Sequence, residues 1–138
     1  MALFCPASSR VFYLKGRTMA NVSPSIVDAN TPTSGKVTLV TWANLTTTNS
    51  AGDPVSGAVN ADRTVQIHGT FGVGGSIQFQ GSLDGINWFP VTDPQGNAIT
   101  KSAPWLEAVT EVTQFVRPIV QAGDGTTNVT VILLARGK

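Results

Sequence analysis

Few residues in this sequence have side chains that commonly carry out acid–base chemistry. His68 is the single histidine, and an imidazole is the side chain that most readily exchanges protons near neutral pH. A catalytic histidine needs a partner that sets its pKa and orientation, and no acidic residue stands beside His68 in the sequence. The alternating pattern around it points its side chain outward, so we expect an ordinary surface histidine.

The aspartates follow the pattern of turn residues rather than that of a metal site. Asp53, Asp84, Asp93 and Asp124 each stand next to a glycine or a proline, and aspartate favours tight turns because its carboxylate accepts bonds from nearby backbone amides. A calcium loop would need several acids at alternate positions. Cys5, the single cysteine, can form neither an internal disulfide nor a cysteine-rich zinc site. We therefore expect no metal site.

Sequence motifs for nucleotide binding or nucleophilic catalysis are also missing. Residues 72–75 read Gly-Val-Gly-Gly, but no helix is expected after them, whereas phosphate loops rely on a helix N-terminus. The chain has no Gly-Lys-Ser/Thr phosphate loop and no Gly-x-Ser-x-Gly elbow. The sequence predicts no catalytic residue, no cofactor and no enzymatic activity.

Large aromatic side chains are the remaining candidates for binding. These are Trp42, Trp88, Phe89 and Trp105. In a carbohydrate-binding sandwich, exposed tryptophans form a flat platform for sugar rings. In a structural protein they fill the core or anchor a subunit contact. No Trp-x-Trp cluster places two of them on one face, which favours the core or an interface.

The composition of the chain indicates that these residues are carried on an all-β fold. Thr, Val and Ile make up more than a quarter of the chain, and β-branched side chains pack well on a pleated sheet. Charged residues form 12% of the chain and the formal net charge is +1, so no strong field attracts nucleic acid or an anionic membrane. No apolar run reaches the ~18 residues of a transmembrane helix, and we expect no secretion signal.

Alternating apolar and polar residues from residue 36 onward predict seven or eight short strands. The pattern is typical of a two-sheet β-sandwich with jelly-roll-like or immunoglobulin-like connections, and a closed barrel is the alternative. Residues 104–113 fit either a helical or a strand spacing, and their Val and Thr content favours a strand or irregular segment. Residues 46–62 are expected to form a long loop. The other expected strands are 36–42, 64–71, 76–83, 88–92, 114–121 and 128–135.

The expected strand pairing makes predictions for individual residues. Leu83 continues the inward-facing set of its strand, and Asp84-Gly85 is a tight-turn signal because glycine accepts a positive φ. Trp88, on the returning strand, is expected to pack against the core. Pro118 has no N–H to donate, which predicts an edge or bulged strand there.

Residues 1–34 are expected to form an irregular arm ahead of a sandwich domain at 35–138. The arm has several turn formers, and its first 18 residues carry three cations and no acid around an apolar patch at 11–14. It is either a tail without function, such as an extension upstream of a second start at Met19, or an arm that lies on a partner subunit. In the second case the partner-binding residues are Arg10, Phe12, Tyr13, Lys15 and Arg17, through desolvated rings and cation–carboxylate pairs.

The C-terminal half contains a strand–turn–strand hairpin, Gly81-Ser-Leu-Asp-Gly-Ile-Asn-Trp-Phe-Pro-Val91, in which an Asp-Gly turn precedes a tryptophan. The segments 92–99, 115–120 and 124–132 follow it. Together they resemble the head cement proteins of tailed, podovirus-like bacteriophages, whose fold is a jelly roll.

The resemblance implies a structural virion protein on the outside of the capsid, located in the host cytoplasm before assembly. There it would bind across the seams between capsomers and stabilise the shell. The implied partners are the major capsid protein and further copies of this chain, a dimer more than a trimer, with no direct nucleic acid or membrane partner. The alternative is a phage tail or host-recognition accessory module with a carbohydrate-binding β-sandwich. Tryptophans exposed together in one patch would favour that alternative.

Overall fold

The computed structural model describes residues 21–28, 37–56 and 62–137, and these ranges contain strands but no helix. Accordingly, no helix in the described part of the chain could cross a bilayer. In chain order the strands are β1 (Ser25–Asp28), β2 (Val37–Leu45), β3 (Val55–Ser56), β4 (Asp62–Thr70), β5 (Ser76–Ser82), β6 (Phe89–Pro90), β7 (Thr100–Lys101), β8 (Trp105–Ala108), β9 (Phe115–Ala122) and β10 (Asn128–Arg136).

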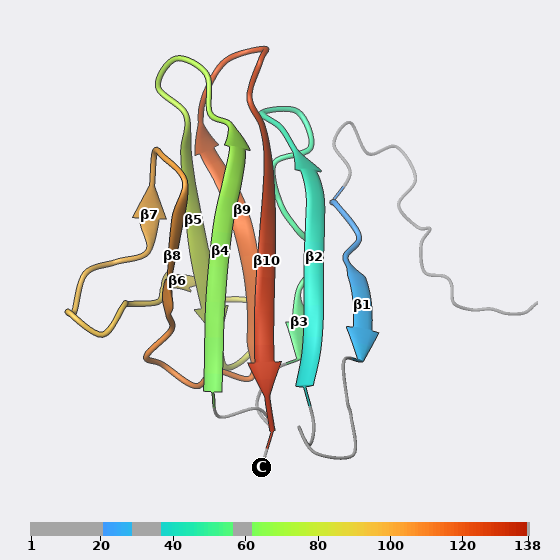
Figure 1. Cartoon of the computed structure of the whole chain (residues 1–138), viewed down its shortest axis with the longest axis vertical. Helices are drawn as coiled ribbons and strands as arrows, with labels where there is room; N and C mark the ends of the chain where they lie inside the picture. The colour runs from blue at the N-terminus through green and yellow to red at the C-terminus, as the bar shows by residue number, and fades with distance from the viewer. Residues whose placement is uncertain (1–20, 29–36, 57–61, 138) are drawn as a thin grey trace, which may run out of the picture.

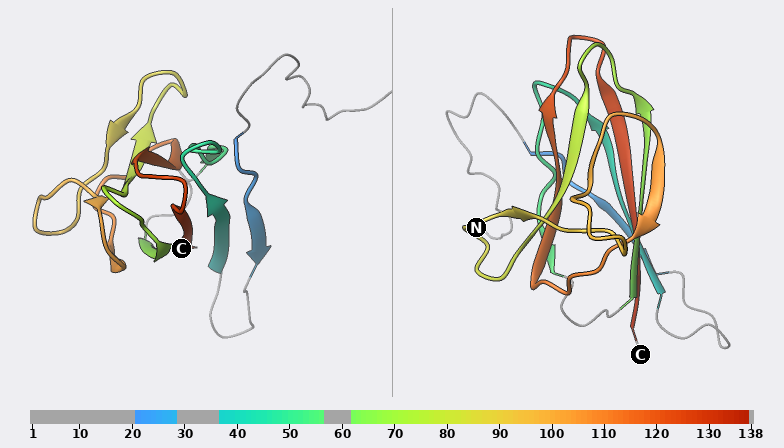
Figure 2. Two further views of the ribbon diagram at one scale, coloured as in Figure 1. Left: turned by 90° about the horizontal axis from the view of Figure 1, so that it is seen from above. Right: turned by 90° about the vertical axis from the view of Figure 1, so that its left-hand side faces the viewer.

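The strands form two sheets that pack face to face, as Figures 1 and 2 show. The first sheet has the order β1-β2-β10-β4-β8, and the second has the order β3-β9-β5-β6, with β7 also paired to β5. All pairs between these strands are antiparallel. β10 lies between β2 and β4, and β9 lies between β3 and β5, so most neighbours within a sheet come from distant parts of the chain, as in a jelly roll. The prediction of an all-β, two-sheet, jelly-roll-like sandwich is confirmed.

The core lies between the sheets and follows from the alternation of the long strands. In β4, Val65 and Ile67 are fully buried while Gln66 and His68 are exposed. Trp42 of the first sheet is also fully buried and meets Phe79 of the second edge to face, with 6.2 Å between the ring centroids. Large aromatic side chains contribute strongly to such a core because each buries much apolar surface.

The first sheet begins closer to the N-terminus than the sequence indicated. Residues 25–28, assigned to the irregular arm, form the edge strand β1 and pair with β2 from Ser25–Thr41 to Asp28–Thr38. The expectation that residues 1–34 form an irregular arm is therefore wrong for these four residues. The strand is short and follows a proline, so period-2 alternation has too few positions to be recognised.

The prediction for Pro118 is also wrong about the position of its strand. β9 is not an edge strand, because it lies between β3 and β5. Pro118 is tolerated because it pairs with Phe79, whose own N–H and carbonyl bond to Ile99 and Val91 on the other side. The backbone nitrogen and carbonyl of Pro118 therefore lie on the side of β9 away from β5. There the Gly52 N–H donates to the Pro118 carbonyl at 2.9 Å, and no N–H from Pro118 is needed. The other alternative, a bulged strand, is confirmed: Ser76 and Ile77 pair with Ala122 and Val120, so the register skips Gln121 of β9.

At one end of β5, the turn after β4 is tied to the turn after β9. The Asp124 carboxylate accepts hydrogen bonds from the Val73 N–H at 2.8 Å and from the N–H and hydroxyl of Thr126 at 2.8 and 2.6 Å. These bonds, the hydroxyl of Thr126 first, lower the pKa of Asp124 to about 2. Gly72 is required beside this carboxylate, since its φ is 72° and a Cβ there would lie 2.3 Å from Asp124 Oδ1.

Candidate functional site

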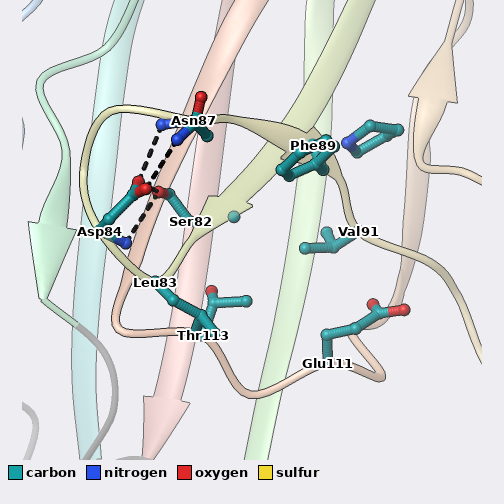
Figure 3. A pocket seen from close by; sticks show the side chains of 10 residues that line it. Ser82, Leu83, Asp84, Asn87, Phe89, Val91, Glu111 and Thr113 are labelled. Atoms are coloured by element: carbon teal, nitrogen blue, oxygen red, sulfur yellow. Dashed lines mark hydrogen bonds between the residues drawn. The ribbon is translucent and has the colours of Figure 1, made fainter.

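At the other end of β5, the chain forms a loop that is built on Asp84. The Asp84 Oδ1 accepts from the N–H groups of Ile86 and Asn87, both at 2.8 Å, and from the Ser82 hydroxyl at 2.9 Å. The Asn87 side-chain amide donates to Oδ2 at 2.7 Å, and the Gly85 N–H donates to the Ser82 hydroxyl. Figure 3 shows these bonds folding the loop around one carboxylate. They hold the pKa of Asp84 well below its usual range, the backbone amide of Asn87 contributing most.

This loop is wider than the tight turn that the sequence predicted. The last residues paired between β5 and β6 are Gly81 and Phe89. Residues 82–88 therefore lie outside that pairing, although Ser82 still pairs with Phe115 of β9, and the return strand is only Phe89–Pro90. Gly85 does have the expected positive φ, at 77°. The two-residue reversal is replaced because a carboxylate that binds amides two and three residues ahead favours a longer, self-capped loop.

A pocket lies between this loop and the segment that follows β8. Its volume is about 370 Å³, and its walls are mostly apolar. Gly81 provides the space, since a Cβ there would lie 2.6 Å from Thr113 Oγ1 and 2.9 Å from Val91 Cγ1. Figure 3 shows the hairpin side chains on one side and Glu111 and Thr113 on the other. The lining residues are Gly81, Ser82, Leu83, Asp84, Asn87, Phe89, Pro90, Val91, Glu111 and Thr113.

The far wall of the pocket is held by partly buried hydrogen bonds. Thr92 donates its N–H and its hydroxyl to the two carboxylate oxygens of Glu111, at 2.7 and 2.6 Å. Burial raises the pKa of Glu111, but the bonds from Thr92 outweigh it, and the net pKa is lowered. Arg63 is only 3% exposed and donates to the Thr113 carbonyl at 2.9 Å. Residues 111–113 are thus held in place although they form no strand.

Exposed apolar side chains surround the mouth of the pocket. Leu83 is 75% exposed and Phe89 is 66% exposed, and Ile86 at the loop tip is exposed as well. The prediction that Leu83 faces inward is wrong, because the burial of β5 stops alternating after Phe79, residues 79–82 are all buried, and the strand ends at Ser82. Large apolar groups held in water on a stiff loop are typical of a surface that binds a partner.

The two carboxylates at the pocket define the chemistry of a suitable partner. Asp84 and Glu111 both have lowered pKa values, so both stay ionised at neutral pH. An apolar side chain next to a lysine or arginine would fill the pocket and meet these charges at its margin. The arrangement suits binding of a protein segment.

The tryptophans occupy three different environments. Trp42 is in the core. Trp88 is only half-buried, so the prediction that it packs into the core is wrong. The Arg117 guanidinium lies over its ring, 4.3 Å from the centroid. Trp105 is half-buried against the core, with the Lys101 ammonium 4.5 Å from its ring centroid. A cation over an aromatic face is attractive, and it occupies a face that a sugar would need.

The other residues singled out from the sequence do not gather into a site. His68 is exposed, as predicted, and its Nδ1 lies 3.1 Å from the Gln66 amide nitrogen. Within the described ranges, no three His, Cys, Asp or Glu residues are grouped so that they could hold a metal ion. The predicted partner-binding residues Arg10, Phe12, Tyr13, Lys15 and Arg17 lie outside the described residues, as does Cys5.

Comparison with known proteins gives little further information. No protein-family model matches the chain, and neither does any curated protein sequence. Among solved structures, the crystal structure of FeII HppE is similar over 81% of this chain, with 12% sequence identity and a TM-score of 0.33. The chain spans 56% of the length of that structure. The function of this chain must therefore be inferred from its own residues.

Proposed function

We propose that this chain is a structural virion protein that binds the outside of a phage capsid across the seams between capsomers and stabilises the shell. The observation that carries the proposal is the loop at residues 82–88, which is stiffened by Asp84 and holds Leu83 and Phe89 in water beside an apolar pocket. The hairpin that contains this loop is also the part of the sequence that resembles phage head cement proteins.

The mechanism is the addition of interface free energy at a weak seam. A shell packed with DNA is under outward stress, and a rigid sandwich bound to two capsomers must be detached before they separate. A stable protein interface buries roughly 1,600 Å² in total. Many copies on a closed lattice act together, because each bound copy limits the movement of its neighbours. The pocket provides the desolvated anchor that such an interface needs at its centre.

The residues proposed for the arm supply a second contact. Arg10, Phe12, Tyr13, Lys15 and Arg17 combine cations with aromatic rings, a composition suited to lying along an acidic and apolar groove of a neighbouring subunit. The major capsid protein and further copies of this chain are the proposed partners. The proposal includes no catalytic step, so His68→Ala is expected to leave attachment unchanged.

The experiment that tests this function is reconstitution on heads stripped of their cement protein. Purified chain should bind at a fixed number of copies per head and raise the temperature at which the heads release their DNA. A chain lacking residues 1–18 should keep its melting temperature but bind more weakly. Absence of the protein from purified virions, or no binding to stripped heads, would reject the proposal.

The carbohydrate-binding alternative is less well supported. It needs several tryptophan faces open in one patch, whereas Trp42 is buried and cations lie over Trp88 and Trp105. Soluble glycans should therefore leave the tryptophan fluorescence of the protein unchanged.

A further inference from the structure

The outer face of the first sheet is unusually apolar for a surface that meets water. In a sandwich, the residues that point away from the core are ordinarily polar. Here the register places apolar residues directly opposite one another across three strands, Val27 against Leu39 and Leu39 against Leu134. Two residues away, Ile132 lies opposite Gln66, which lies opposite Leu106. The apolar side chains are adjacent across β1, β2 and β10, and Gln66 of β4 separates them from Leu106 of β8.

These side chains are exposed because no element of the described chain covers them. Val27 is 55% exposed, Leu106 is 63% exposed and Leu134 is 38% exposed, while Leu39 and Ile132 are half-buried by their neighbours. Figure 1 views the sheet from this side, with β2, β10 and β4 in front of β9 and β5. We name this surface, made of Val27, Leu39, Ile132, Leu134 and Leu106, the outer band.

The outer band is also nearly free of charge. Asp62 and Arg136 lie at the end of the face where β4 and β10 pair, and they form an ion pair with each other. The other outward residues of β4 and β10 near the band, such as Thr64 and Gln66, are uncharged. A charged partner would find no complementary group here. A second, identical face has the same neutral, apolar character and would suit it.

The size of the face is sufficient for a specific pair. β2, β4 and β10 have nine residues each, and the edge strands β1 and β8 have four each, so at about 3.3 Å per residue and about 4.8 Å between strands the face measures roughly 550 Å². Two such faces would cover roughly 1,100 Å² in total, and a specific interface needs about 1,000 Å². Sheets of long strands pack face to face at about 10 Å with their side chains interdigitated.

We propose that the outer band binds the outer band of a second copy of this chain, in a two-fold pair centred on β10. β10 is the middle strand of the five, so a two-fold axis there brings Leu134 close to its own counterpart. The biological role of this pairing rests on the proposed function, because a pair of chains can bind two capsomers. Two sandwiches joined in this way present two hairpin pockets, one for each side of a seam. The pairing itself takes place in free solution.

The test is the mass of the full-length chain in sedimentation equilibrium. The wild type should sediment at twice the 14.4 kDa of one chain. Leu134→Lys and Leu39→Lys should each weaken the pair by at least about tenfold, because each buries an unpaired ammonium. The matched control is Val73→Lys, which adds the same charge at an exposed apolar position outside both the outer band and the hairpin pocket and should leave the mass unchanged. Circular dichroism checks that every variant is folded.

Two further variants separate this pairing from other arrangements. Leu134→Glu should be monomeric alone but should form a pair with Leu134→Lys when the two are mixed, since opposite charges then meet at the axis. Phe12→Ser with Tyr13→Ser should remain paired. A monomeric wild type at the highest attainable concentration would overturn the proposal, as would unchanged pairing in both lysine variants. Loss of pairing in the Phe12/Tyr13 variant would do so too, by identifying the arm as the occupant. Capsid binding is measured separately, so its failure would leave the pairing result intact.

Discussion

The loops at the two ends of β5 are both built on an aspartate, and the use of that aspartate differs between them. Asp124 lies in the connection from β9 to β10 and accepts a bond from Val73 in the connection from β4 to β5, so it joins two turns that run between the sheets. Within the described part of the chain, Asp84 accepts bonds only from its own loop, from Ser82, Ile86 and Asn87. The first loop is braced by the rest of the fold. The second is stiff but stands free beside a pocket, the arrangement that a preorganised binding surface requires.

The largest expected effect is a difference in stability between alanine variants at the two glycines of these loops. Gly72 and Gly85 have nearly the same φ, 72° and 77°, but a Cβ on Gly72 would lie 2.3 Å from Asp124 Oδ1, whereas a Cβ on Gly85 has its nearest contact at 3.5 Å. Gly72→Ala should therefore lower the free energy of unfolding by about 3 kcal/mol, through overpacking and lost bonds together with backbone strain. Gly85→Ala should cost about 1 kcal/mol, through strain alone.

Urea denaturation of the two variants measures this difference. Gly74→Ala is the control, because its φ is 71° and nothing lies within 4 Å of the added Cβ. It should behave like Gly85→Ala. Equal costs for Gly72→Ala and Gly85→Ala would show that Asp124 does not brace the turns.

A moderate effect is expected in acid. The pKa of Asp124 falls from 3.8 to about 2 on folding, so its contribution to stability is present above pH 3.8 and is lost as the pH falls through about 2. The melting temperature should drop over this window, and the drop should be smaller in Asp124→Asn. Asp84 has an even lower pKa, but its protonation should free only its own loop. Hydrogen exchange at the Ile86 and Asn87 amides would then accelerate without global unfolding. If Asp84→Asn lowered the global stability as much as Asp124→Asn does, the proposed difference between the two aspartates would be contradicted.

The smallest effect on stability is expected at the rim of the pocket. Leu83→Ser and Phe89→Ser remove side chains that are mostly in water, so each should change the free energy of unfolding by less than about 0.5 kcal/mol. Thermal denaturation measures this. A loss of several degrees in melting temperature would mean that these side chains support the fold rather than a binding surface.

Much of the fold was predictable because long strands repeat a simple pattern. In β4, Val65 and Ile67 alternate with Gln66 and His68, and this alternation alone assigns both the strand and its buried face. Short elements were missed for the opposite reason. β1 has four residues and β3 has two, so the pairing that defines them comes from β2 and β9, which a local pattern does not contain.

The candidate site was less predictable because it depends on where a pattern stops. The alternation of β5 predicted Leu83 inside, but the bonds of Asp84 to Ile86 and Asn87 draw the chain out of the ladder. The hydrogen bond from Thr92 to Glu111 joins segments that are 19 residues apart, and no local sequence pattern predicts it. The Asp-Gly pair was the available signal, and it identified the loop but not its width. The outer band was visible only as the unbroken apolar run in β10, whose face required the register of β2 and β4.

The most direct test of the account is the occupancy of stripped phage heads by a rim variant. Leu83→Ser with Phe89→Ser should be folded and yet bind at least roughly 30-fold more weakly than the wild type, because two apolar anchors are lost from the centre of the contact. Val73→Ser, which removes an equally exposed apolar side chain at the braced end of β5, should bind like the wild type. Counting bound copies per head by cryo-electron microscopy at a fixed concentration gives the result. Full occupancy by the rim variant would contradict the claim that this hairpin attaches the protein to the capsid.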